Sequence, residues 1–339
     1  MELFFPLFII FLALVFDFYN GMNDAANSIA TVVSTRVLKP FHAVLWAAFF
    51  NFVAAFVFGT DVAKTIGAGL IDGKIIDYKV IFSGLVGAIV VSSIATHRGL
   101  PISISHAIIG GMGGAAVMKQ GFESLIMLGF TKVILFIFFA PMLGFVIAYI
   151  FSIITLWIVR NKPPRIVDKY FRKLQLVSAG LYSLSHGAND AQKTMGIITM
   201  VLALMAAGES GGIATKTFHV PFWVVITSHT VIAFGTLVGG WKVIKTLGMR
   251  MTKLNPFGGF SAETSAGLTI IGATIFGIPV STTHTITGSI AGVGAVKSLS
   301  AVRWGVARII VWAWVLTIPL SASVSAGTYW VFIKVLHLF

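Results

Sequence analysis

The chain has 339 residues, of which 57% are hydrophobic and 10% charged, with no cysteine and a formal net charge of +13. A soluble chain of this length could not bury so much apolar surface, so the composition predicts a polytopic membrane protein and excludes disulfide and thiol chemistry. The basic residues flank apolar runs instead of forming a patch, which is typical of the positive-inside bias and does not indicate nucleic-acid binding.

Long apolar runs without strand-like alternation predict an all-α protein, because each helical crossing of a bilayer needs about 20 apolar residues. The first run has neither a positive start nor a small-residue cleavage site, so no cleavable signal is expected. The expected helical segments are 3–34, 41–59, 80–97, 100–118, 124–159, 176–206, 221–241, 260–276, 279–296 and 303–337.

Three phrases recur in the same order in the two halves of the chain. GMNDAAN at 21–27 matches GANDAQK at 187–193, and GLPISISH at 99–106 matches GIPVSTTH at 277–284. Between them, VAKTIG in the first half matches VIKTLG in the second. Self-similarity of this kind predicts a duplicated structural unit.

Loop charges predict that the two repeats are inverted. Between a first repeat at 1–159 and a second at 176–339 lies a linker, 160–175, whose six basic residues against one acid place it in the cytoplasm. The loop at 60–79 balances three lysines with three aspartates, whereas its counterpart at 241–259 carries four basic residues and no acid. Equivalent loops are therefore expected on opposite sides of the membrane, with both termini outside.

Each Gly-x-Pro phrase predicts a re-entrant helical hairpin. Proline lacks a backbone donor and disfavours a helical residue before it, so one helix ends and another begins inside the membrane. Two inverted copies would direct two helix N-termini, with their free amides, at one point suited to a phosphate-like anion. The alternative is a pair of ordinary kinks whose hydroxyls are satisfied locally. The candidate phosphate ligands are Ser103, Ser105, Ser281, Thr282, Thr283, Asn23, Asn189 and Thr194.

The Asn-Asp phrases supply oxygen ligands of the kind that a hard cation prefers. Gly21 and Gly187 are expected to break their helices, so that main-chain carbonyls join the side chains. Alternatively, Asp190 could simply pair with Lys193 one turn on, but Asn27 stands at that position in the first phrase, so this pairing cannot explain the repeat. No resident cofactor is expected. The candidate ligands of a coupling sodium ion are Asp24, Asp190, Asn23, Asn27, Asn189 and Gln192.

The roles of four other polar residues stay open. Glu263, whose repeat counterpart is Leu85, could bind or carry a coupling ion or make a structural hydrogen bond. His186 could contact the anion, shuttle a proton or pack between helices, and Lys193 is a candidate for coupling or gating. Asp17 is more simply a helix-end residue near the membrane interface than a ligand.

The four Asn-Asp and hairpin phrases resemble those of the inorganic phosphate transporter (PiT) family of permeases, from about residue 4 to 335. The resemblance implies secondary active phosphate uptake driven by sodium or protons, an inverted-repeat fold, external termini and a homodimer in the cell (inner) membrane. Met22 replaces a usual alanine, Asn51 stands where some relatives carry a membrane glutamate, and the large central domain of animal members is missing. By position, the resemblance assigns functional roles to Asp24, Asp190, Ser103, Ser281, Glu263 and His186.

We predict sodium-coupled symport of phosphate by alternating access, with phosphate between the hairpin helix starts and the cation at Asp24 and Asp190. The alternative is proton-coupled uptake of phosphate, metal phosphate or sulfate, which would use Glu263 or His186. A cation exchanger or channel is less favoured, because helix N-termini aimed at the pathway do not help a lone cation. Catalysis is not predicted. The expected partners are phosphate, sodium and the lipid bilayer.

Overall fold

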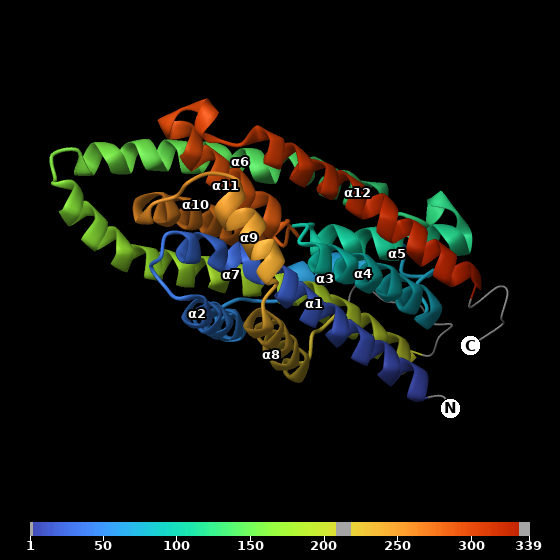
Figure 1. Cartoon of the computed structure of the whole chain (residues 1–339). Coiled ribbons are helices and arrows are strands. Elements are labelled where there is room, and N and C mark those ends of the chain that lie inside the picture. Colours follow the sequence, from blue (N-terminus) through green and yellow to red (C-terminus); the bar gives the residue numbers. More distant parts are fainter. Residues whose placement is uncertain (1–2, 208–217, 332–339) are drawn as a thin grey trace.

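The computed structural model describes residues 3–207 and 218–331, and helices dominate them (Figure 1). This confirms the all-α class. The short helices α3 and α9, which carry the VAKTIG and VIKTLG phrases, were not predicted, because eight and ten residues are too few for a span. The helices are α1 (Phe4–Ser34), α2 (Pro40–Val53), α3 (Asp61–Ala68), α4 (Tyr78–Arg98), α5 (Ile104–Gln120), α6 (Met127–Val159), α7 (Pro164–Ala207), α8 (Phe222–Val238), α9 (Trp241–Arg250), α10 (Pro256–Ile275), α11 (Thr282–Lys297) and α12 (Trp304–Tyr329).

Long apolar helices form part of the outer surface of the molecule. Among the described residues, α1, α4, α6 and α12 are long and apolar enough to cross a membrane. Two bent pairs, α2 with α3 at 86° and α8 with α9 at 75°, raise the number of possible spans to six. Large side chains such as Phe138, Ile150 and Trp157 of α6 are exposed. An apolar surface of this kind is suited to lipid, in which helices satisfy their own backbone groups.

The helices α1 and α7 run without interruption through Gly21 and Gly187, so the predicted break at the Asn-Asp phrases is wrong. A Cβ atom on Gly21 would lie 2.1 Å from the carbonyl oxygen of Ile232, and one on Gly187 would lie 2.6 Å from that of Asn51. These glycines therefore allow α1 to approach α8 closely, and α7 to approach α2. The sharp bends lie instead between α2 and α3 and between α8 and α9.

The basic segment at 160–175 is mostly helical. Helix α7 begins at Pro164, so only the residues before it turn the chain back from α6. Within the segment Arg172 pairs with Asp168 at 2.9 Å and donates to the carbonyl of Arg36 at 3.1 Å. The boundary between the two repeats stays a prediction.

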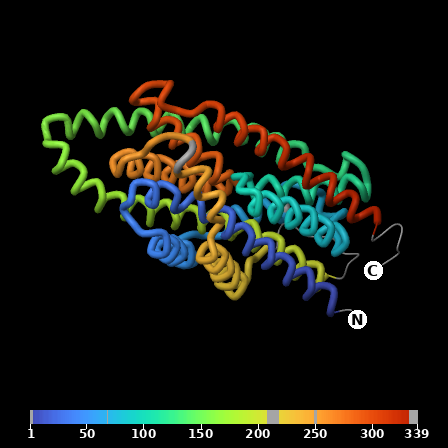
Figure 2. Tube along the Cα trace, in the orientation of Figure 1, coloured from blue at the N-terminus to red at the C-terminus, as the bar shows by residue number. Residues whose placement is uncertain are grey.

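Equivalent helices of the two halves run in opposite directions. Helix α1 begins at the right of Figure 1 and α7 begins at the left, and the colour gradient along the tube in Figure 2 shows the same reversal for α6 and α12. The last helix of each half packs on the hairpin of the other, α12 against α5 and α6 against α11. The turn from α6 to α7 lies at the end of the molecule opposite the start of α1 and the end of α12 (Figure 1). This arrangement agrees with the inverted repeats expected from loop charge.

The predicted hairpins are α4 with α5 and α10 with α11. After the first helix of each pair the chain turns at a glycine in the left-handed region, Gly99 with φ 72° and Gly277 with φ 64°. Only glycine adopts this conformation without strain. The second helix is capped by a serine hydroxyl, Ser103 or Ser281, which accepts a first-turn amide.

Each hairpin turn is held by a short helix from the other half of the chain. The hydroxyl of Thr65 in α3 donates to the carbonyl of Gly277 at 2.7 Å. At the equivalent position, the hydroxyl of Thr246 in α9 donates to the carbonyl of Gly99 at 3.0 Å. The recurrence of VAKTIG and VIKTLG thus has a structural reason, because both phrases bring a threonine to a hairpin turn.

Candidate functional site

The polar faces of α1 and α7 meet at Asp24, His186 and Asp190. These side chains are buried, and their candidate ligand atoms all lie within 4.8 Å of one another. The Nε2 atom of His186 is 3.7 Å from Asp24 Oδ2 and 3.8 Å from Asp190 Oδ2. Two carboxylates at this depth repel each other unless a positive charge lies near both. The structure therefore brings the two repeated aspartates together around His186.

Asn51 orients His186 in this site. The amide nitrogen of Asn51 donates to the hydroxyl of Thr236 at 2.9 Å, which leaves its Oδ1 to accept from His186 Nδ1 at 3.1 Å. Nδ1 therefore carries a hydrogen and Nε2 faces the two carboxylates. Apart from its departure from the family pattern, nothing in the chain pointed to this role for Asn51.

Lys193 lies against Asp190. Its ammonium is 2.6 Å from Asp190 Oδ1 and 3.4 Å from the carbonyl of Val280, and both side chains are fully buried. The pairing considered as an alternative from the sequence is therefore present. Oδ2 of Asp190 has no hydrogen-bond partner within the described part of the chain and lies 3.8 Å from Nε2 of His186.

The start of α11 reaches the carboxylate of Asp24. The hydroxyls of Thr282 and Thr283 lie 3.3 Å from its Oδ2 and Oδ1. Thr283 also accepts a hydrogen bond of 2.9 Å from the amide of Asn27. A carboxylate is stabilised beside a helix N-terminus, where the backbone amides point outward. The aspartate expected to hold a cation and a helix start expected to hold an anion are thus in direct contact.

The two hairpins also bond to each other across the site. Ser105 donates to the carbonyl of Val280 at 3.4 Å, and Thr283 lies 3.2 Å from the carbonyl of Ile102. These pairs occupy equivalent positions in the two halves. The hairpin tips therefore meet, as the inverted repeat requires, and Ser105 and Thr283 have partners in this conformation.

The three asparagines of the phrases share one arrangement. The amide of Asn23 donates to Thr96 at 2.8 Å, and that of Asn189 donates to the equivalent Thr274 at 2.9 Å. In Asn23, Asn27 and Asn189 the carbonyl oxygen is buried without a donor. Hard cations take oxygen ligands, so these acceptors fit one. Thr96 and Thr274 were missed, although each stands shortly before its hairpin turn.

Three other predicted residues have hydrogen-bond partners of their own. Gln192 accepts from the first amides of α3, Val62 at 2.9 Å and Ala63 at 3.2 Å, so it holds that helix in place. The hydroxyls of Ser103 and Ser281 accept the amides three residues on, at 3.2 and 3.3 Å, and keep a hydrogen to donate. Thr194, in contrast, has a buried hydroxyl without a partner.

Glu263 lies in a separate network between α7 and α10. Its carboxylate accepts from Gln175 at 3.0 Å and from Ser178 at 2.5 Å. Gln175 in turn accepts from Thr35, the residue that follows α1, at 2.9 Å. Glu263 is thus fully hydrogen-bonded by side chains that the sequence did not single out.

Asp17 is a buried residue of α1 and not a residue at the membrane interface, so that expectation is wrong. It stands seven residues before Asp24, on the same helix face. Its carboxylate faces Asn20 and Thr194 without a well-formed hydrogen bond. The spacing to Asp24 was the available signal that it faces the protein interior.

Three comparisons with known proteins agree. A model described as "Phosphate transporter family" matches residues 20–325. The chain belongs to the phosphate transporter family. It is 53% identical to a Rhizobium meliloti protein over 96% of both chains, and 42% identical to a Bacillus subtilis protein over 95% of this chain and 96% of the other. Both relatives are described as "Probable low-affinity inorganic phosphate transporter".

A solved structure titled "The sodium-dependent phosphate transporter" superposes with a TM-score of 0.87. It is 26% identical and the match covers 98% of this chain and 99% of that one. The family inferred from the four phrases is therefore confirmed, and its members are named for transport and not for catalysis.

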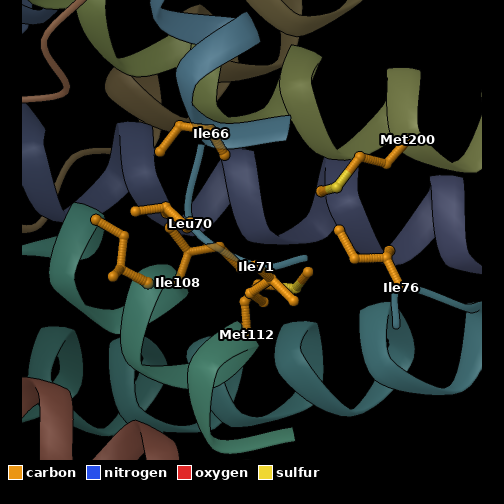
Figure 3. Close-up of a pocket in the computed structure, with 8 residues that line it drawn as sticks. Ile66, Leu70, Ile71, Ile76, Ile108, Met112 and Met200 are labelled. Atoms are coloured by element: carbon orange, nitrogen blue, oxygen red, sulfur yellow. The ribbon is translucent and has the colours of Figure 1, made fainter. Parts of the chain in front are cut away.

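A small cavity beside α3, α5 and α7 is unsuited to phosphate (Figure 3). Its eight lining residues are all isoleucine, leucine or methionine, among them Ile66, Leu70, Met112 and Met200. Apolar walls offer no donor to an anion and no ligand to a hard cation. In this transporter family member the polar cluster at Asp24 and Asp190 is the better candidate site.

Proposed function

We propose that this member of the phosphate transporter family is a sodium-coupled symporter of inorganic phosphate that works by alternating access. The observation that carries the proposal is the set of buried acceptor oxygens in the two Asn-Asp phrases that have no donor among the described residues. They belong to Asn23, Asn27, Asn189 and Asp190. Burying an acceptor oxygen without a donor costs free energy, and a sodium ion would coordinate several such oxygens at once.

The starts of α5 and α11 are the proposed phosphate contacts. Their first-turn amides and the hydroxyls of Ser103, Ser105, Ser281 and Thr282 are donors, as an anion requires. Asp24 stands at the start of α11, so phosphate would approach a carboxylate. A sodium ion beside Asp24 would offset that repulsion, which gives a physical reason for the two ligands to bind together.

The burial of the proposed ligands supports alternating access. Asp24, His186, Asp190 and Lys193 are at most 2% exposed. Ions and phosphate can reach them only after helices move. The hydrogen bonds between the hairpin tips, such as that from Ser105 to Val280, are contacts that such a movement would break.

Uptake of radiolabelled phosphate into proteoliposomes tests the coupling. We expect an inward sodium gradient to drive accumulation at equal internal and external pH, and potassium to fail as a substitute. Asp24→Asn should abolish the sodium response, because it removes the negative charge that balances the ion. Accumulation driven only by a pH gradient, at any sodium concentration, would contradict the proposal.

Proton coupling is the second candidate, and His186 favours it. Its Nε2 lies between the two aspartate carboxylates, and a protonated ring would neutralise them in the way proposed for sodium. His186→Gln separates the candidates. Sodium-driven uptake should survive it in reduced form, whereas proton-driven uptake should be lost.

The sidedness and the assembly state belong to the same proposal. External termini and a cytoplasmic turn at 160–163 are supported by the basic charge of 160–175 and by the position of that turn opposite the two ends of the helical bundle. A homodimer in the inner membrane is implied by the family resemblance. Labelling of single introduced cysteines from either side of the membrane tests the sidedness. The mass of the purified protein in detergent tests the homodimer.

A further inference from the structure

The two Asn-Asp phrases differ at one charged position. Aligning Asp24 with Asp190 places Asn27 opposite Lys193. A neutral amide in the first copy therefore corresponds to a permanent ammonium in the second. No other pair of equivalent residues in the two phrases differs in charge.

The contacts of Lys193 show what the ammonium replaces. Its Nζ lies 2.6 Å from Asp190 Oδ1 and 3.4 Å from the carbonyl oxygen of Val280. The equivalents of these two oxygens in the first half belong to Asp24 and to Ile102. The Oδ1 atom of Asp24 and the carbonyl oxygen of Ile102 both lie within 3.3 Å of the hydroxyl oxygen of Thr283.

In the first copy, no lysine or arginine of the described residues pairs with Asp24, whose carboxylate lies 3.7 Å from the ring of His186. The direct partners of Asp24 are the hydroxyls of Thr282 and Thr283, and the carbonyl oxygen of Asn27 beside it is buried without a donor. A carboxylate, a backbone carbonyl and an amide carbonyl together form a ligand set for a small hard cation. The equivalent place in the second half already holds an ammonium.

We propose that the ammonium of Lys193 takes the place of a second coupling cation, so that the chain binds one fewer sodium ion than a symmetric pair of Asn-Asp sites would. This inference rests on the proposed sodium coupling. It assigns Lys193 a role in setting the ratio of sodium to phosphate. An ammonium fixed to α7 neutralises Asp190 in every state of the cycle, whereas a sodium ion at Asp24 binds and leaves.

The consequence for transport is a weaker dependence on the sodium gradient. Each additional coupled sodium ion multiplies the highest attainable ratio of internal to external phosphate by the sodium concentration ratio across the membrane. Where the cycle carries net charge, the membrane potential changes this factor. A transporter that couples one sodium ion fewer therefore reaches a lower maximum phosphate accumulation, but it also uses one sodium ion fewer in each transport cycle. Lys193 would act as a specificity-determining residue for stoichiometry, with no contact to phosphate required.

The test compares the wild type with Lys193→Asn, which restores the first-half residue. Purified protein is titrated with radioactive sodium at equilibrium, and the bound sodium per chain is counted. We expect Lys193→Asn to bind one more sodium ion than the wild type, and its uptake in proteoliposomes to depend more steeply on sodium, with the Hill coefficient raised by about one. Lys193→Arg, which keeps the charge, should keep the wild-type number of bound ions.

The mirror variant Asn27→Lys keeps the inference testable if Lys193→Asn does not fold. It places an ammonium beside Asp24 and should bind one sodium ion fewer than the wild type. Equal sodium binding by the wild type and either folded variant would overturn the role of Lys193. A wild-type protein that binds no sodium at all would instead overturn the proposed sodium coupling, so the two failures are distinguishable.

Discussion

The two halves of the molecule share a framework and differ in charge. Asn23 and Asn189 donate to equivalent threonines at 2.8 and 2.9 Å, so the backbone geometry around each phrase is duplicated closely. Asp190 is paired with an ammonium, whereas the partners of Asp24 among the described residues are two hydroxyls and the ring of His186. The repeat thus duplicates the positions of these polar side chains, whereas one substitution, lysine for asparagine, changes the charge beside one of the two aspartates.

The largest effect should come from Asp190→Asn. This change leaves the ammonium of Lys193 buried without its carboxylate, and removing one partner of a buried ion pair costs about 3–5 kcal/mol of stability. Asp24→Asn removes a charge that has no ammonium partner, so its loss of stability should be much smaller. Thermal unfolding in detergent at one pH measures both.

A double variant is the control for this asymmetry. Asp190→Asn combined with Lys193→Met removes both charges and should recover most of the lost stability. Equal destabilisation by Asp24→Asn and Asp190→Asn would show that the two aspartates are equivalent after all.

A smaller effect is expected at the paired glycines. A methyl group on Gly21 would meet the carbonyl of Ile232 at 2.1 Å, and one on Gly187 would meet the carbonyl of Asn51 at 2.6 Å. Overpacking of this kind costs about 1–3 kcal/mol, and the closer contact should place Gly21→Ala at the upper end of that range. Unfolding midpoints of the two alanine variants test the order. Gly305→Ala is the matched control, because a Cβ there would meet nothing within 4 Å.

The smallest effect should come from the two hairpin caps. Ser103 and Ser281 accept their first-turn amides at nearly the same distance, so each alanine variant should lose about 1 kcal/mol of stability. The framework is symmetric here, and the two losses should agree. If phosphate binds at both helix starts, both variants should also raise the phosphate concentration needed for half-maximal uptake. A change confined to one variant would restrict the phosphate contact to one hairpin.

Much of the fold was predictable because its signals are local or repeated. Gly99 and Gly277 mark the hairpin turns by their chemistry, and the repeated phrases reveal the duplication. The break expected at Gly21 was wrong, because a glycine in a membrane helix serves either a bend or a close helix contact, and only the position of Ile232 decides between them. Glu263 looked isolated in the sequence because its partner Gln175 is 88 residues away.

The sequence by itself determined the membrane class, the inverted repeat, the hairpins and the family, because composition, periodicity and duplicated motifs are properties of the chain alone. Only the tertiary structure decided which polar groups meet. It placed His186 between two aspartates, brought the start of α11 to Asp24 and buried Asp17 in the interior. Contacts of this kind depend on how helices pack across the two halves, and hydrogen bonds and ion pairs act only over a few ångströms.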